Sequence, residues 1–181
     1  MIEVLHRSAP MGDTTGRTVH GTVVPYGEIA TVRDFPSGRS YRERFQMGAF
    51  ARSIEQRGHK IRLLIQHSER SLPVGQAVEL TEVSTGLRAV FLISDTTAGN
   101  DALTLIRDGI IDSFSIGFSP IRDHIDSDGV VVRTEAAMRE VSLVTTSPAY
   151  SKALIAGVRT QDVPVIDIDS ARRIFAIEFE M

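Results

Sequence analysis

The order of apolar and polar positions along the chain predicts mostly β-strands. In several short runs apolar residues alternate with polar ones, which is typical of strands with one face in a core. Glycine, proline and short polar stretches separate these runs. The expected strands lie at residues 17–26, 41–45, 60–67, 73–80, 86–93, 111–120 and 138–150.

Two segments follow a helical period instead. In residues 47–58, Phe50 and Ile54 stand at helical spacing, and residues 97–109 show the same period before a closing glycine. Short polar turns between neighbouring strands predict antiparallel hairpins. The pattern as a whole predicts an α+β, mainly β fold, in which a small antiparallel β-barrel or half-barrel is surrounded by a few helices.

One folded domain is expected over residues 16–159, between two appendages. Residues 1–15 hold acidic, His and small polar residues where a secretory signal needs an unbroken apolar stretch, and are expected to form a flexible leader. Residues 160–181 have too many apolar side chains for a solvated linker and too few for a core. We expect this tail to be a docking or scaffold-like segment, with Pro164 confining its first half to a sheet edge.

Composition narrows the classes of function. The 181 residues carry a formal net charge of -3, so no net positive field attracts nucleic acid or an anionic membrane. Cysteine is absent, which excludes disulfides, thiolate metal sites and cysteine nucleophiles. No apolar stretch approaches the roughly 18 residues of a membrane span. We expect a soluble cytoplasmic protein that binds neither nucleic acid nor membrane.

Ser115 is a candidate nucleophile. Strand alternation places large residues, Phe114 and Ile116 among them, on one face of residues 111–120 and small ones, including Ser115 and Gly117, on the other. A serine nucleophile needs such room, because a substrate backbone must approach its hydroxyl and nearby N–H groups must reach the developing oxyanion. A half-exposed strand with a polar face has the same pattern, so alternation alone does not identify a nucleophile.

His67 is a candidate base. Ile61, Leu63, Ile65 and His67 share one face of the expected strand, which places the imidazole at a strand end beside a polar turn. A general base suits such a partly buried position. A surface histidine at a strand terminus would show the same pattern.

Glu140 is a candidate for the acidic partner of a base. It shares a strand face with Ser142 and could orient an imidazole N–H there. An exposed strand glutamate is the alternative, and Asp112 and Asp101 are further candidates, although Asp112 falls on the face opposite Ser115. The remaining histidines show no HExxH or similar spacing, so we expect no metal and no cofactor.

Four segments, taken in order, resemble the HK97-type prohead protease family. FQMGAFARSI resembles an early helix of that family, and LLIQHSERSLPVGQAVEL resembles its histidine block. GNDALTLIRDGIIDSFSIGF is similar to the helix that leads into its serine strand, and REVSLVTTSPAY to its Glu-Val-Ser strand. The resemblance covers residues 18–158. The residues beside the histidine depart from it, because Gln66 and Ser68 stand where many members have Asn and Asp.

The resemblance implies a serine endopeptidase with a fold similar to herpesvirus assembly proteases. It assigns the family's histidine to His67 and its serine to Ser115, which makes residues 16–159 the protease domain. The acidic third member falls on Glu140, with His124 as the alternative because herpesvirus relatives use a second histidine.

The resemblance also implies partners and a place of action. The substrates would be the major capsid protein and scaffold of a phage or phage-like particle, cleaved inside the immature capsid in the bacterial host cytoplasm. Because herpesvirus relatives dimerise, residues 160–181 are expected to pack on a second copy in a homodimer, or else on their own domain. A non-catalytic capsid-assembly module of the same fold is the alternative function.

Overall fold

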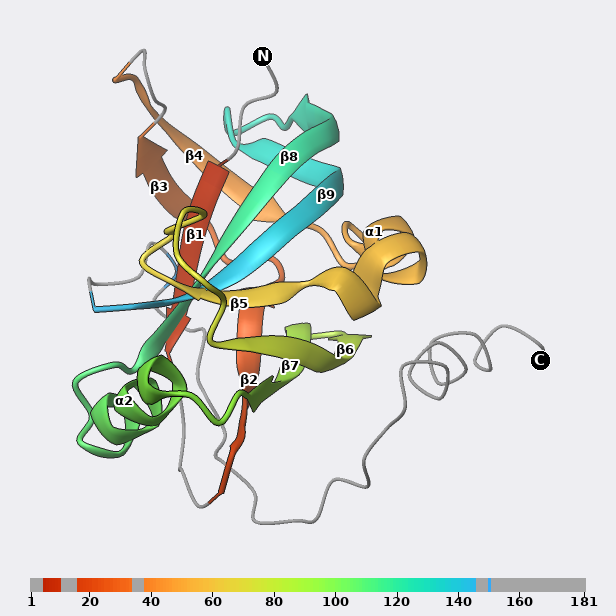
Figure 1. Cartoon of the computed structure of the whole chain (residues 1–181). Helices are drawn as coiled ribbons and strands as arrows, with labels where there is room; N and C mark the ends of the chain where they lie inside the picture. The colour runs from red at the N-terminus through yellow and green to blue at the C-terminus, as the bar shows by residue number, and fades with distance from the viewer. Residues whose placement is uncertain (1–4, 11–15, 34–37, 146–149, 151–181) are drawn as a thin grey trace.

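The computed structural model describes residues 5–10, 16–33, 38–145 and 150, with side chains from residue 16 onward. Strands dominate it, and two helices lie at its periphery (Figure 1). The elements, in chain order, are β1 (Leu5–Pro10), β2 (Thr18–Pro25), β3 (Ala30–Arg33), β4 (Ser40–Phe45), α1 (Ala51–Arg57), the 3-10 helix η1 (Gly58–Lys60), β5 (Arg62–Ile65), β6 (Gly75–Val83), β7 (Gly86–Ile93), α2 (Thr97–Arg107), β8 (Ser113–Ile125) and β9 (Val131–Val144).

All nine strands belong to one sheet. Its main order is β1-β8-β9-β5-β6-β7-β2, with β4 attached to β9 and β3 to β4. The mainly β fold with few helices is confirmed. A closed antiparallel barrel is not supported, because β1 and β2 end the order without pairing with each other in the described residues, and both β4 and β5 run parallel to β9. Alternation predicts strands but not their partners, so the sequence could not reveal this.

Strand β9 pairs with three strands of the sheet. β8 pairs with almost the whole length of β9 on one edge. On the other edge, β4 pairs with the first residues of β9 and β5 with its last residues. Between β4 and β5 that edge is satisfied by the segment entering α1: Ala136 N donates to Ala49 O (2.8 Å) and Met138 N to Ser53 Oγ (2.9 Å). The start of α1 therefore contacts β9 between the residues that pair with β4 and those that pair with β5.

Aromatic residues fill the core on one side of β8. Phe114 and Phe118 are fully buried, as alternation predicts for the large face of this strand. Phe118 packs edge-on against Phe45 with ring centroids 5.0 Å apart, and Phe114 lies 5.4 Å from Phe91. The small-residue face of β8 points away from this aromatic core.

A buried ion pair ties β4 to β9. Arg133 Nε donates to Glu43 Oε2 at 3.1 Å, and the Tyr150 hydroxyl lies 3.1 Å from Glu43 Oε1. Burial is the largest single influence and lowers the pKa of Arg133, but Glu43, Tyr41 and Asp123 together outweigh it, so the pKa is raised. Removing Arg133 would take this guanidinium from the buried carboxylate of Glu43, whereas removing Glu43 would leave Arg133 paired with Asp123.

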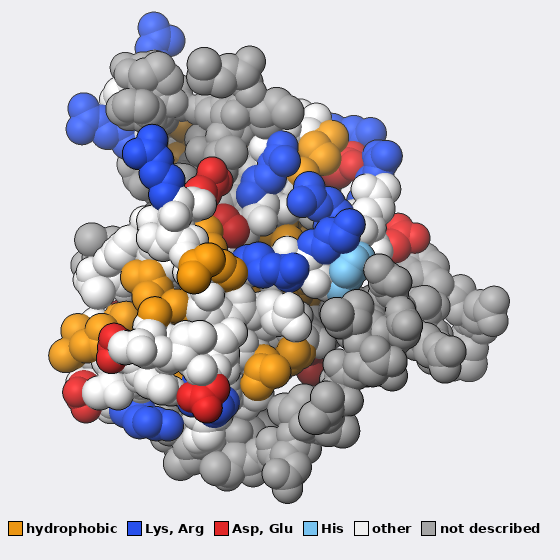
Figure 2. Space-filling view, in the orientation of Figure 1, with side chains coloured by type: hydrophobic (Ala, Val, Ile, Leu, Met, Phe, Trp, Pro, Cys, Tyr) orange, Lys and Arg blue, Asp and Glu red, His pale blue; other side chains and the backbone are white. Residues whose placement is uncertain are grey.

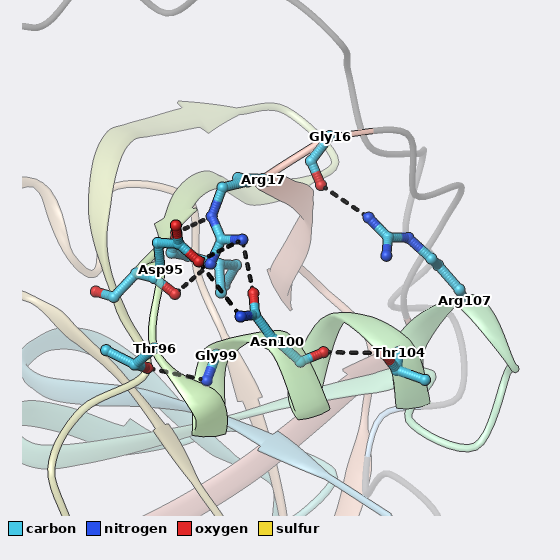
Figure 3. Close-up of polar contacts among 10 residues, drawn as sticks. Gly16, Arg17, Asp95, Thr96, Gly99, Asn100, Thr104 and Arg107 are labelled. Atoms are coloured by element: carbon cyan, nitrogen blue, oxygen red, sulfur yellow. Dashed lines mark hydrogen bonds and ion pairs between the residues drawn. The ribbon is translucent and has the colours of Figure 1, made fainter.

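Helix α2 leads into β8 and is fixed at its first turn. The Thr96 hydroxyl caps it by accepting the Gly99 N–H at 3.1 Å. Figure 3 shows Arg17, just before β2, spanning Asp95 and Asn100, whose side-chain oxygen accepts from Arg17 at 2.7 Å. These contacts join the start of α2 to the edge strand β2.

The remaining boundaries differ from expectation in several places. The sequence predicts no strand at β3, and β8 ends at Ile125 and β9 begins at Val131 instead of at residues 120 and 138. The sequence predicts no strand before residue 16, whereas Leu5–Pro10 pairs antiparallel with β8. The tail, residues 160–181, and its expected docking lie outside the described residues. Among the described helices, neither α1 nor α2 has the length and hydropathy to cross a bilayer.

Candidate active site

Ser115 lies on β8, an inner strand of the sheet between β1 and β9. In the antiparallel β8–β9 ladder it stands opposite Ser142, and Gly117 stands opposite Glu140. Because side chains two residues apart share a face, the four residues line one face of this strand pair. Ser115 is 2% exposed, so its hydroxyl is held among protein atoms. The large residues of β8 point the other way, into the aromatic core.

His67 reaches this face from a left-handed turn after β5. The strand ends at Ile65, and Gln66 and His67 adopt φ values of 51° and 55°. The sequence predicts that His67 continues the strand face of Leu63 and Ile65. That prediction is wrong, because two successive left-handed residues break the alternation and redirect the side chain.

Hydrogen bonds to β9 hold this turn. A non-glycine residue in the left-handed region costs about 1–3 kcal/mol and persists only where its surroundings enforce it. Gln66 N donates to Leu143 O at 2.9 Å, and Gln66 Nε2 to Thr145 Oγ1 at 2.7 Å. His67 N donates to Ser142 Oγ at 3.1 Å. These hydrogen bonds therefore hold a strained turn that directs the imidazole of His67 toward Ser115 and Glu140.

The imidazole of His67 bridges Ser115 and Glu140. Nε2 lies 2.8 Å from Ser115 Oγ, and Nδ1 lies 2.7 Å from Glu140 Oε1. An ionised carboxylate only accepts hydrogen bonds, so the ring carries its proton on Nδ1 and leaves Nε2 free to accept from the serine. The His67 side chain is 21% exposed and Glu140 only 6%, so the site meets solvent on the histidine side.

Gly117 makes room for the carboxylate of Glu140. A Cβ on Gly117 would lie 3.1 Å from Glu140 Cδ and would overlap Oε1. Any other residue here would push the carboxylate from its present position. The contact between Glu140 and His67 therefore requires glycine at position 117.

Ser142 contacts both the base and the acid. It is fully buried, accepts the backbone N–H of His67 and donates its hydroxyl to Glu140 Oε2 at 2.6 Å. Both carboxylate oxygens of Glu140 are therefore hydrogen-bonded, one by the ring of His67 and one by Ser142.

This arrangement can activate a hydroxyl. A serine whose proton can pass to an imidazole, itself oriented by a buried carboxylate, has the parts needed for nucleophilic attack and proton return. The carboxylate stabilises the imidazolium that forms when the proton is taken, because the pair lies largely out of solvent. The chemistry such a site supports is acyl transfer.

The other candidates for the partner of His67 lie elsewhere. His124 is exposed near the far end of β8, and at about 3.3 Å per residue it lies roughly 30 Å along the strand from Ser115. Asp112 is exposed and accepts from the Ser113 hydroxyl at 2.6 Å. Asp101 is exposed on α2. Of the four candidates, only Glu140 contacts His67.

A surface groove lies apart from these residues. It has a volume of about 330 Å³ and is lined by residues of α1, β8 and β9, namely Arg52, Ser53, Gln56, Arg57, Ile121 and Ala137. Figure 2 shows Lys and Arg side chains gathered over β5, β9 and α1 on the face in view. The negative net charge of the chain is therefore unevenly spread, and this face is basic.

Two contributors to the site carry signals in the sequence that do not specify a role. Ser142 and Gly117 fall by alternation on the faces of Glu140 and Ser115, but alternation does not say that one bonds and the other yields space. The left-handed turn at Gln66 and His67 has no glycine or asparagine to announce it.

The match to a family model agrees with this chemistry. The family model described as caudovirus prohead serine protease matches residues 5–165. The prohead protease of Enterobacteria phage HK97 is 30% identical over 121 residues, which are 64% of this chain and 52% of the relative, so the chain spans about half the length of that curated relative. The capsid assembly protease of bacteriophage T4 is a structural neighbour with a TM-score of 0.48 and 9% identity, covering 72% of this chain and 98% of the T4 chain. Since the family model spans most of the chain, this protein belongs to the caudovirus prohead serine protease family.

Proposed function

We propose that this chain is a serine endopeptidase that cleaves capsid or scaffold proteins during maturation of a phage or phage-like prohead. The observation that carries the proposal is the hydrogen-bonded series Ser115–His67–Glu140, with separations of 2.8 and 2.7 Å. Membership of the prohead serine protease family supports both the reaction type and the substrate class. Cleavage would take place inside the immature capsid, in the cytoplasm of the bacterial host.

In each half of the proposed reaction His67 acts first as a base and then as an acid. His67 Nε2 takes the proton of Ser115 as the serine oxygen attacks a peptide carbonyl, and Glu140 stabilises the imidazolium. The imidazolium returns the proton to the leaving amine, which yields an acyl-enzyme. Water, deprotonated by the same imidazole, then releases the acyl group and regenerates the serine.

Co-expression with the capsid and scaffold proteins of the same particle tests the proposal. Intact-mass measurement of both proteins should show defined truncations with the wild-type chain and none with Ser115→Ala. Ser113→Ala is the matched control, because Ser113 is a buried serine on the same strand face whose hydroxyl bonds Asp112 instead of His67. Equal processing by wild type and Ser115→Ala would refute the assignment.

A fluorophosphonate probe separates activity from substrate choice. It should label the wild-type chain on Ser115, as located by peptide mass mapping, and leave Ser115→Ala unlabelled. Labelling without truncation of capsid or scaffold would keep the serine hydrolase and reject these substrates. Absence of both labelling and truncation would favour a non-catalytic assembly module.

A further inference from the structure

We propose that Ser142 is a positioning residue that locks the base and the acid of the site into one rigid unit. The inference rests on the proposed function, since it concerns the same proton-transfer site. Ser142 Oγ lies 3.1 Å from His67 N and 2.6 Å from Glu140 Oε2, and the residue is fully buried. No part of it needs to contact the substrate.

The direction of both hydrogen bonds follows from their chemistry. The main-chain N–H of His67 can only donate, so Ser142 Oγ is the acceptor in that bond. Its single proton is then free for Glu140 Oε2, which accepts it. A hydroxyl that accepts one bond and donates the other has no rotational freedom left.

The three residues close a ring of hydrogen bonds. His67 N donates to Ser142 Oγ, Ser142 donates to Glu140 Oε2, and His67 Nδ1 donates to Glu140 Oε1. The carboxylate of Glu140 is therefore bonded directly to the imidazole of His67, and through Ser142 to the main chain of His67. Rotation of the carboxylate or displacement of the turn would break two bonds at once.

The local backbone explains why such a link is needed. His67 has a φ of 55° directly after Gln66 at 51°, a conformation that non-glycine residues leave unless they are held. Gln66 is bonded to Leu143 and Thr145, and His67 N is bonded to Ser142. In the parallel β5–β9 pairing Ser142 stands beside Leu64, and across β8 it faces Ser115, so it joins all three parts of the site.

A positioning role predicts a specific kinetic result for Ser142→Ala. Loss of the hydroxyl lets the imidazole and carboxylate drift, and a misplacement of about 1 Å can cost about 100-fold in rate. We expect kcat to fall by about 10- to 100-fold while KM changes by less than about 3-fold, because substrate contacts remain. Ser142→Thr, which keeps the hydroxyl, should restore more of kcat than it restores of thermal stability.

Ser53→Ala is the matched control. Like Ser142, Ser53 is buried and its hydroxyl accepts a backbone N–H, here that of Met138 at 2.9 Å. It contacts none of the three site residues in the bonds described above. Both alanine variants should lose similar thermal stability, whereas only Ser142→Ala should lose kcat beyond what its unfolded fraction explains.

A proton NMR spectrum supplies a readout that a purely structural serine would not move. The far-downfield signal of His67 Nδ1–H, assigned by its loss in His67→Ala, should be present in wild type and Ser53→Ala, and broadened or absent in Ser142→Ala. Equal kcat and an unchanged signal in folded Ser142→Ala would overturn the inference. If wild type itself neither processes capsid or scaffold nor labels with fluorophosphonate, the proposed function fails instead, and the NMR signal still decides whether Ser142 holds the pair.

Discussion

Gly117 stands directly opposite Glu140 in the β8–β9 ladder, and the carboxylate of Glu140 occupies the space where a side chain of residue 117 would be. Gly117→Ala should therefore push the carboxylate away from His67 and lower kcat by about 10- to 100-fold. If Gly117 acts only through Glu140, the double variant Gly117→Ala/Glu140→Gln should be no slower than Glu140→Gln alone. Additive losses in this cycle would contradict the steric explanation.

Glu140→Gln should slow turnover more than it weakens substrate binding. The amide is nearly isosteric with the carboxylate but lacks the charge that stabilises the imidazolium formed during attack. We expect kcat to fall by about 100- to 10,000-fold, with a smaller change in KM. Steady-state kinetics on a peptide spanning the mapped capsid cut site measures both constants, and unchanged kcat would remove Glu140 from the mechanism.

Ser115→Ala should abolish processing and leave the fold intact. It removes one hydroxyl from the small-residue face of β8 and creates little cavity, so the free energy of unfolding should change by about 1 kcal/mol or less. Urea denaturation of both proteins measures this difference. A much larger loss would mean that the inactive variant reports unfolding, and the activity test would then rest on fluorophosphonate labelling of the wild type.

Arg133→Met should destabilise the protein strongly because it removes the guanidinium that is bonded to the buried carboxylate of Glu43. Breaking a buried ion pair by removing one partner costs about 3–5 kcal/mol. Arg122→Met is the surface control, since Arg122 is 75% exposed and its contact to Glu135 spans 3.6 Å, and it should cost about 1 kcal/mol or less. The double variant Arg133→Met/Glu43→Leu should recover part of the stability, and failure to exceed Arg133→Met would contradict a charge-based cost.

Asp126, in the turn between β8 and β9, should make the free energy of unfolding decrease at acidic pH. The backbone N–H of Val130, bonded at 2.9 Å, together with that of Asp128 and the charge of Arg44, holds the pKa of Asp126 below its ordinary 3.8 despite some opposing desolvation. A lowered folded pKa stabilises the protein above the unfolded value and loses that effect as pH falls through the folded value. Asp126→Asn should therefore be less stable than wild type at pH about 7, with the gap closing below pH about 4. Urea midpoints at both pH values test this, with Asp128→Asn as the control because Asp128 enters these bonds only through its main chain.

Local periodicity determined much of the fold and which residues of the site share a strand face. It located both helices and most strands, and alternation placed Ser115 with Gly117 on one face of β8 and Glu140 with Ser142 on one face of β9. These inferences succeed because side-chain direction within a strand depends only on neighbouring residues. The sequence, with the family resemblance, also put His67 forward as a partner.

Only the tertiary structure decided how these faces meet. The His67–Ser115 and His67–Glu140 contacts span 48 and 73 residues, and strand pairing at such separations depends on the whole sheet, including the parallel edge of β9. The left-handed turn that redirects His67 contains no glycine or asparagine, and besides its own Ser68 N to Ile65 O hydrogen bond it is stabilised by bonds to β9. The sequence by itself thus determined which side chains share a strand face, while long-range pairing decided that Glu140 and not His124 contacts the imidazole, because such pairing is a property of the assembled sheet.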